Sequence, residues 1–141
     1  MTDRLRLHAT AIAIDGRGIL IIGSAGSGKS SLALQLLGMG FTLIADDQTD
    51  LTRRDDMLWA APPISIRGMI EARGIGLLNA ETTQAAIEFV IDLDHHERDR
   101  LPELHEVTFL GVTRPCLYKV DTVAWPAAIL QYLKGGRREP Q

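Results

Sequence analysis

Runs of apolar residues along the chain are separated by short segments rich in glycine, proline and aspartate, and most of the runs have the length of a β-strand. Segment 5–14 alternates bulky apolar residues with smaller or polar ones and stops at the turn signal Asp15-Gly16-Arg17-Gly18. A continuous apolar run follows at 19–22. The pattern predicts a hairpin whose second strand is buried on both faces.

Helical periodicity is confined to two segments. In 29–39 the apolar residues at 32, 33, 36 and 37 form one stripe, and Gly40 suits the left-handed end of a helix. Segment 122–133 is the predicted closing helix, in which Pro126 fits only the first turn. Further strands are predicted at 41–45, 85–93, 107–110 and 115–120, with a hairpin at 49–52 and 57–61 and a strand or loop at 70–80. These elements predict a single α/β domain over residues 1–141.

Composition narrows the class of protein. The 141 residues fit one compact domain, and a hydrophobic share of 45% is enough for a real core. A net charge of −3 argues against a nucleic-acid-binding surface. The single cysteine, Cys116, favours a reducing compartment and a packing role, and no apolar run approaches the length of a membrane helix. We therefore expect a cytoplasmic protein without membrane contact.

The segment Gly23-Ser24-Ala25-Gly26-Ser27-Gly28-Lys29-Ser30 is a complete P-loop motif. In a P-loop, successive backbone N–H groups face one concavity that holds a phosphate, and glycines let the backbone come close. Lys29 is therefore assigned to the β- and γ-phosphates, and the Ser30 hydroxyl to Mg²⁺. The expected nucleotide-binding set runs from Gly23 to Ser31. A chance glycine-rich turn is the alternative, but the strand before the motif and the helix after it favour a nucleotide site.

Two adjacent carboxylates, Asp46 and Asp47, directly follow the predicted strand 41–45. We expect that strand beside the P-loop strand, and open α/β sheets bind ligands at the carboxyl ends of their strands. One carboxylate can hold the metal, while the other accepts a proton from a nucleophile. The alternative is a solvated Asp-Asp-Gln turn.

Three blocks of the sequence resemble the HPr kinase/phosphorylase family. They are the P-loop preceded by His8, the run Leu43-Ile44-Ala45-Asp46-Asp47, and the segment Ile70-Glu71-Ala72-Arg73-Gly74-Ile75-Gly76. The Glu-x-Arg-Gly-x-Gly block is far more specific than the P-loop itself. The family consists of bifunctional bacterial protein kinases with a fold related to phosphoenolpyruvate carboxykinase. They phosphorylate a serine of HPr, the small phosphocarrier of the sugar phosphotransferase system, and remove that phosphate with inorganic phosphate.

The resemblance implies a P-loop kinase core with a mixed sheet flanked by helices, ATP and Mg²⁺ as ligands, and HPr as the partner. Asp46 matches the family's catalytic aspartate, a base toward the serine hydroxyl and an acid in the reverse reaction. Asp47 matches its neighbour and is assigned to the metal together with Ser30 and Glu71.

Three further side chains complete the implied site. His8 matches a histidine near the site that adjusts the local charge. Arg73 lies in the signature segment, where Glu71 and Arg73 share one face if the segment is a strand. Arg114 is the one arginine of segment 111–116, which corresponds to an arginine-rich loop in full-length members. Arg73 and Arg114 are therefore the candidate cations for the substrate phosphates.

The chain also departs from the family pattern. Full-length members have an additional N-terminal domain, so this chain resembles a short form. They commonly have an acidic residue directly after the P-loop Lys-Ser, where this chain has Ser31. With so few arginines in 111–116, we expect kinase activity to exceed phosphorylase activity.

Two other functions remain open from the sequence. The chain could be a regulatory module that binds nucleotide with little transfer, which Ser31 and the reduced C-terminal loop favour. It could be a small-molecule kinase, although no segment is an obvious lid. Homo-oligomers are a further possibility, because the full-length family is hexameric. Trp59 and Trp125 are interpreted as packing residues.

Overall fold

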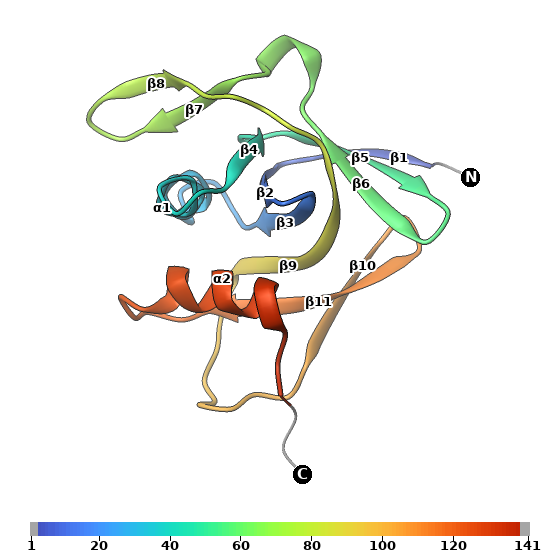
Figure 1. Cartoon of the computed structure of the whole chain (residues 1–141), viewed down its shortest axis with the longest axis vertical. Helices are drawn as coiled ribbons and strands as arrows, with labels where there is room; N and C mark the ends of the chain where they lie inside the picture. The colour runs from blue at the N-terminus through green and yellow to red at the C-terminus, as the bar shows by residue number, and fades with distance from the viewer. Residues whose placement is uncertain (1–2, 139–141) are drawn as a thin grey trace.

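The computed structural model describes residues 3–138 and contains two α-helices, one 3₁₀ turn and eleven strands in that range (Figure 1). In chain order the elements are β1 (Arg4–Leu7), β2 (Ala9–Ile14), β3 (Arg17–Ile22), α1 (Lys29–Leu37), β4 (Thr42–Ala45), β5 (Thr49–Arg54), β6 (Met57–Ala61), the 3₁₀ turn (Ile64–Ile66), β7 (Met69–Ala72), β8 (Gly76–Asn79), β9 (Ala85–His96), β10 (His105–Phe109), β11 (Val112–Lys119) and α2 (Trp125–Gly135). The expected α/β class is confirmed.

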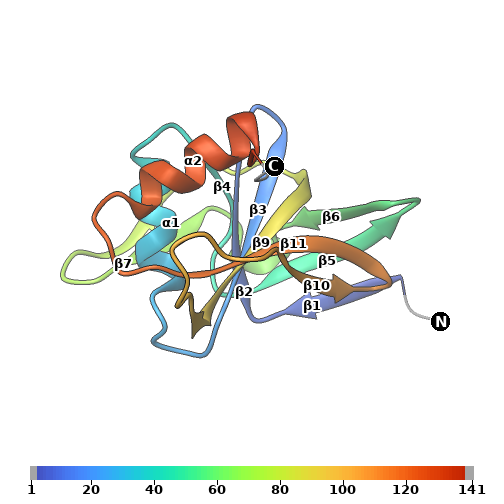
Figure 2. The same cartoon turned by 90° about the horizontal axis from the view of Figure 1, so that it is seen from below.

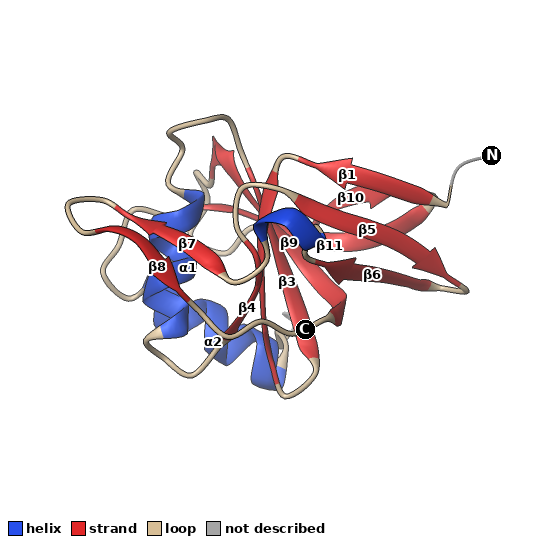
Figure 3. Ribbon diagram, turned by 90° about the horizontal axis from the view of Figure 1, so that it is seen from above, coloured by secondary structure: helices blue, strands red, loops and turns tan. Residues whose placement is uncertain are grey.

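Strand β9 is the centre of a curled mixed sheet. Along one edge it pairs with β3 in parallel. Its opposite edge pairs first with β6, antiparallel through Ala85 and Ala86, and then with β11 in parallel from Val90 onward. The sheet therefore divides into two arms, one of β6, β5 and β1 and one of β11 and β10. Both arms extend away from the helices (Figures 2 and 3).

Strand β3 is buried on both faces, as its uninterrupted apolar sequence predicts. Leu20 faces a core inside the curl of the sheet, which also contains Leu51, Leu58 and Val90. Ile19 and Ile21 face the opposite side, where α1 and α2 cover the sheet with residues that include Leu32, Leu36, Ile129 and Leu133. Side chains of this kind contribute about 1.5–3 kcal/mol each when fully buried. The two cores hold β3, and the loop that follows it, in a fixed position.

Several predicted elements change in length or order. The predicted strand 5–14 breaks at His8, so that β1 pairs with β5 while β2 pairs with β3 and β4. The expectation that the strand before Asp46 lies beside the P-loop strand is wrong, because β2 lies between β3 and β4. Helix α1 ends at Leu37, and Gly40 has the expected left-handed backbone with φ of +103°.

The C-terminal half follows the predicted order with longer strands. The segment predicted as strand or loop forms the β7–β8 hairpin, a separate two-stranded sheet beside α1 (Figure 1). Pro126 lies in the first turn of α2, where its missing N–H has no helical partner to lose. Within residues 3–138, neither helix is long and apolar enough to cross a membrane.

Candidate active site

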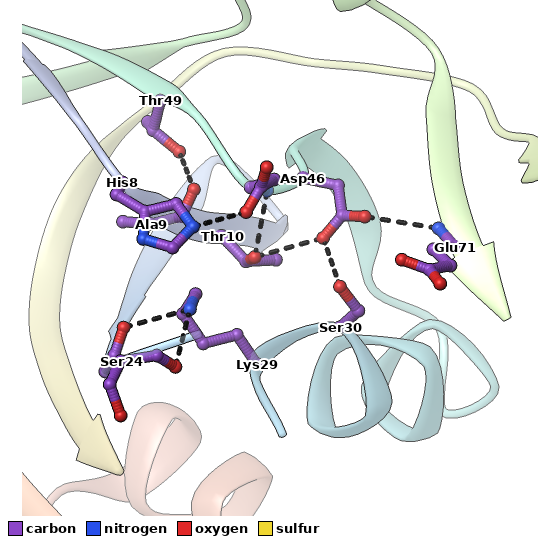
Figure 4. A network of polar contacts seen from close by, with 11 residues as sticks. His8, Ala9, Thr10, Ser24, Lys29, Ser30, Asp46, Thr49 and Glu71 are labelled. Atoms are coloured by element: carbon purple, nitrogen blue, oxygen red, sulfur yellow. Dashed lines mark hydrogen bonds and ion pairs between the residues drawn. The ribbon is translucent and has the colours of Figure 1, made fainter. Parts of the chain in front are cut away.

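The P-loop joins the buried end of β3 to the first turn of α1. Gly28 has φ of +103°, a backbone conformation that L side chains rarely adopt, and it precedes the helix directly. At Gly23 a Cβ atom would come within 2.5 Å of Ser27 Oγ, so this position has room only for glycine. Lys29 is 6% exposed, and its Nζ donates to the carbonyl oxygens of Gly23 and Ser24 over 2.9 and 3.1 Å. The loop thus curves around the ammonium group (Figure 4).

Asp46, at the end of β4, has both carboxylate oxygens engaged. Oδ1 accepts from the hydroxyl of Ser30 over 2.6 Å and from the hydroxyl of Thr10 over 3.0 Å. Oδ2 accepts from the backbone N–H of Glu71 over 3.2 Å. The carboxylate therefore ties the P-loop helix, β2 and β7 to one point (Figure 4).

Asp47 faces a different partner. Its backbone has φ of +68°, in the left-handed region that aspartate tolerates better than most residues, and its N–H donates to Thr10 Oγ1 over 3.2 Å. The side chain turns toward His8, whose Nε2 lies 2.5 Å from Oδ1. The two side chains are 67% and 50% exposed. Asp47 and His8 thus form a solvent-facing pair beside the Asp46 network.

A cavity of about 600 Å³ collects most of the predicted site residues. Its wall combines the P-loop, the aspartate pair and the β7–β8 hairpin: Ala25, Gly26, Gly28, Lys29, Ser30, Asp46, Asp47, Ile66, Met69, Glu71, Arg73 and Leu77. Glu71 lies on β7, whereas Arg73 lies in the turn after it rather than on the strand. Both side chains nevertheless border the cavity. The signature segment therefore meets the P-loop, as the resemblance implies.

Arg114 is placed elsewhere. Its guanidinium donates to the carbonyl oxygens of Ile87 at 2.9 Å, Thr113 at 3.0 Å and Asp56 at 2.7 Å. These partners link β11 to β9 and to the β5–β6 turn, and Arg114 does not border the cavity. The structure therefore does not bring this predicted site residue to the P-loop.

One acidic side chain at the P-loop has no counterpart among the predicted residues. Asp94, near the end of β9, accepts from the backbone N–H of Ser24 with both oxygens, over 3.0 and 2.9 Å, and from the Ser24 hydroxyl over 2.8 Å. Hydrogen bonds from the backbone and side chain of Ser24 lower the pKa of Asp94, with a smaller contribution from the charge of Lys29. The carboxylate fixes the beginning of the loop to the centre of the sheet.

Comparison with known proteins decides the family. A model of the HPr Serine kinase C-terminal domain matches residues 1–111. The chain belongs to this family. HPr kinase/phosphorylase of Streptococcus uberis is 33% identical over 129 residues, covering 82% of this chain and 42% of the relative. That of Streptococcus mutans is 32% identical over 110 residues, covering 72% of this chain and 35% of the relative.

The HPr kinase fold is also found by comparison with solved structures. The Hpr(Ser) kinase/phosphatase from Coxiella burnetii superimposes with a TM-score of 0.78 at 27% sequence identity. The match covers 92% of this chain and 94% of the Coxiella chain. By contrast, this chain spans less than half the length of the curated HPr kinase/phosphorylases named above. The family model that matches is that of the C-terminal domain.

The P-loop has free polar groups and open space at the position where a phosphate would bind. Ser27 Oγ is buried and has no hydrogen-bond partner among residues 3–138, so it is available to a phosphate oxygen. At Gly26 and Gly28 an added Cβ would meet no atom within 4 Å, which leaves the concave side of the loop open. Ser30 and Asp46 supply hard oxygen ligands, the type that Mg²⁺ prefers. The residues present fit the phosphates of a nucleotide together with Mg²⁺.

Sequence reasoning missed two polar residues of this candidate site. Thr10 is fully buried, and its hydroxyl donates to Asp46 while accepting from the N–H of Asp47. In the sequence it reads as an ordinary β-branched strand residue among alanines. Asp94 lies near the end of β9 and 70 positions from Ser24. The available signal for Asp94 was its place at the carboxyl end of a strand parallel to β3.

Proposed function

We propose that this protein is an ATP-dependent protein serine kinase that phosphorylates HPr. The observation that carries the proposal is the hydrogen-bonded network around Asp46, which connects Ser30 of the P-loop to Thr10 and to the signature segment at Glu71. Beside it stands a second carboxylate, Asp47, paired with His8. Phosphoryl transfer to a hydroxyl depends on a phosphate-binding loop and on a carboxylate that can accept the hydroxyl's proton, and Asp47 is an exposed carboxylate beside the loop.

We propose that the two aspartates divide their roles in the opposite way to the sequence-based assignment. Asp46 contacts the Ser30 hydroxyl at 2.6 Å, and the P-loop serine is the residue that ligates Mg²⁺. Both oxygens of Asp46 already accept hydrogen bonds, whereas the Asp47 side chain is 67% exposed. Asp46 is therefore better placed on the metal side, and Asp47 is better placed to accept the proton of the acceptor hydroxyl.

The remaining side chains of the site orient the Asp47 carboxylate or offset the negative charge of the phosphates. His8 lies within hydrogen-bond distance of Asp47 and orients its carboxylate toward solvent, where an acceptor would approach. Lys29 supplies the point charge for the β- and γ-phosphates, and Arg73 borders the same cavity. Mg²⁺, when bound with the nucleotide, neutralises negative charge on the phosphate oxygens. Two protein cations thus face the place where charge develops during transfer.

A protein acceptor fits the surroundings of the cavity better than a small molecule does. The 3₁₀ turn and the segment of the β7–β8 hairpin, which both contribute residues to the cavity wall, expose large apolar side chains, with Ile64 87%, Ile75 77% and Leu77 71% exposed. Leu77 and Met69 also line the cavity itself. Contiguous exposed apolar residues next to a reactive site are typical of protein-binding surfaces. We therefore assign these side chains to the HPr surface that surrounds the acceptor serine.

The reverse reaction requires two anions, inorganic phosphate and phosphoserine, to lie in line. Their repulsion needs cations beyond Lys29 and Mg²⁺. Arg73 borders the cavity, but Arg114 is occupied by three backbone carbonyls away from it. We therefore propose that phosphorylase activity is weaker than kinase activity.

Incubation with labelled ATP, Mg²⁺ and HPr from the same cell tests the proposal. We expect label on HPr, and none on an HPr variant whose acceptor serine is replaced by alanine. Nucleotide binding without transfer to HPr would support the regulatory-module function instead. Transfer to a small hydroxylated metabolite but not to HPr would support a small-molecule kinase. A second incubation of phosphorylated HPr with millimolar phosphate measures the reverse rate.

A further inference from the structure

A second cavity lies on the other side of the P-loop from the aspartate pair. It has a volume of about 560 Å³ and is bounded by the first turns of α1 and by the segment that joins β11 to α2. In Figure 1 the β7–β8 hairpin lies on one side of α1 and this segment lies on the other. Gly28 borders both cavities, so they meet at the turn of the P-loop.

We propose that this second cavity holds the nucleoside of the bound nucleoside triphosphate. The proposal rests on the proposed function, because it takes the phosphate end of that ligand to be held by the P-loop. Transfer requires the γ-phosphate to face Asp46 and Asp47, and Lys29 marks the β- and γ-phosphates. The α-phosphate and nucleoside must then leave the loop away from the carboxylates. Ser31, the residue after the magnesium-binding serine, borders the second cavity.

An unpartnered polar atom also indicates that the ligand extends from the P-loop into the second cavity. Ser27 borders the second cavity, and its buried Oγ has no hydrogen-bond partner in the described part of the chain. Buried hydroxyls without a partner are rare in folded proteins because an unmade hydrogen bond is unfavourable. A phosphate or ribose oxygen at the junction of the two cavities would satisfy it. The loop therefore presents a donor on the path between them.

The walls of the second cavity suit a nucleoside. Trp125 and Pro126, at the start of α2, give it a flat apolar side, and Val120 and Val123 lie on its border with 36% and 100% of their surface exposed. Stacking of a base on an aromatic ring is favourable and tolerates any base. Gln35 also lines the cavity and can both donate and accept a hydrogen bond. The charged side chains of Lys119 and Asp121 border the cavity as well, so that apolar and polar groups are combined in its wall, as in cofactor sites.

Tryptophan fluorescence offers a direct test, since the chain has only two tryptophans. Trp59 lies on β6, where its Nε1 donates to Gln84 and its ring contacts Arg54, and it borders neither cavity. The Trp59→Phe variant therefore leaves Trp125 as the single reporter. We expect a saturable change of its emission with Mg·ATP and none with Mg·tripolyphosphate, although tripolyphosphate displaces ATP. The Trp125→Phe variant should show no change with either.

A blocking variant tests the position independently. Thr122→Phe places a large side chain on the wall of the second cavity and should weaken Mg·ATP binding about tenfold, a loss equivalent to about 1.4 kcal/mol, with tripolyphosphate binding unchanged. Glu103→Phe is the matched control, since Glu103 borders a different cavity and not the second one. Isothermal titration calorimetry measures both ligands.

The outcomes separate this proposal from the proposed function. ATP binding that leaves Trp125 emission unchanged and is unaffected by Thr122→Phe would place the nucleoside elsewhere and overturn the inference, while nucleotide binding itself stands. Failure of both ATP and tripolyphosphate to bind would overturn the P-loop function together with the inference. A parallel titration with Mg·GTP shows whether the cavity distinguishes the two purines.

Discussion

Ser24 donates both its backbone N–H and its hydroxyl to the carboxylate of Asp94, with all three distances between 2.8 and 3.0 Å. The pair connects the first part of the P-loop to the end of β9, the central strand of the sheet. Charge-assisted hydrogen bonds of this kind are stronger than neutral ones. The loop is therefore anchored at both ends, by Asp94 at Ser24 and by Asp46 at Ser30.

Replacement of Asp94 should loosen the loop. We expect Asp94→Ala to weaken Mg·ATP binding by about three- to tenfold, since ordering the loop then has to occur on binding. Ser24→Ala removes only the hydroxyl contact and should have a smaller effect. Calorimetric titration with Mg·ATP measures both. Tighter binding by Asp94→Ala would mean that repulsion between this carboxylate and the phosphates outweighs the anchoring.

The hydrogen bonds between Ser24 and Asp94 should make the protection of the loop depend on pH. The hydrogen bonds from Ser24 lower the pKa of Asp94. Their contribution to the stability of the folded loop is therefore fully present when the pH is above the ordinary pKa of a carboxylate, and it is lost as pH falls through the lowered pKa. Hydrogen exchange of the Ser24 amide should therefore become relatively less protected at acidic pH. In Asp94→Asn that acid-dependent loss of protection should be absent. A loss of the same size in wild type and variant would exclude Asp94 as its source.

Lys29 is the residue whose replacement should separate folding from activity. Within the described residues its ammonium group donates hydrogen bonds to loop carbonyls, and the side chain belongs to neither apolar core, so Lys29→Ala removes no core contact. We expect phosphotransfer to fall by at least about 10²-fold, because a preorganised positive charge at the phosphates is lost. Thermal unfolding and labelled-ATP transfer give the two readouts. Lys134→Ala, in the last turn of α2, is the control and should retain activity.

Asp46 and Asp47 can be distinguished by comparing binding with transfer. If Asp47 is the proton acceptor, Asp47→Asn should lose about 10²–10⁴-fold in transfer rate while still binding Mg·ATP. Asp46→Asn should instead impair the magnesium-dependent part of nucleotide binding, because the amide is a poorer partner for Ser30 and the metal. Calorimetry with and without Mg²⁺, followed by single-turnover transfer, measures both. The reverse pattern would restore Asp46 as the base.

The parts of the site that could be predicted from the sequence are those determined by local geometry. A buried strand, a glycine-rich loop and a helix in immediate succession leave little freedom for Lys29 and Ser30. Asp46 and Asp47 could be placed because they follow a strand end directly. Glu71 and Arg73 were placed by resemblance, and both border the P-loop cavity.

The remaining features depend on pairings between distant segments. Periodicity does not encode which strands are neighbours, so the insertion of β2 between β3 and β4 was not predicted. That insertion is what brings Thr10 of β2 against Asp46 and Asp47. Likewise, the parallel pairing of β9 with β3 brings Asp94 to Ser24. Arg114 was assigned to the site by resemblance to a loop of the family, but strand pairing places it elsewhere. Its guanidinium donates to backbone carbonyls away from the P-loop.

Replacement of Arg114 should therefore affect stability more than ATP binding. Its guanidinium bonds to Ile87 and Asp56 connect the two arms of the sheet across β9. Hydrogen bonds to charged groups contribute about 1.5–3 kcal/mol each, and partial exposure here places the expected loss for Arg114→Ala nearer 1–2 kcal/mol in total. Urea denaturation measures it. A stable variant with selectively reduced dephosphorylation of HPr would instead support the role assigned from the sequence.

Cys116 should be unreactive in the folded protein. It is 3% exposed in the core inside the curled sheet, and burial raises the pKa of its thiol to about 11, with a smaller contribution from the charge of Asp92. At pH 8 about one thiol in 10³ is then ionised, and the thiolate is the reactive form. Labelling by an aromatic disulfide reagent should therefore be slow in buffer and complete within minutes in 8 M urea. The raised pKa favours the protonated thiol only in the folded state. The contribution of this thiol to the free energy of unfolding is therefore lost as pH rises above about 9. Rapid labelling of native protein at pH 8 would show that the β9–β11 region opens locally, and hydrogen exchange of the β11 amides would then locate the opening.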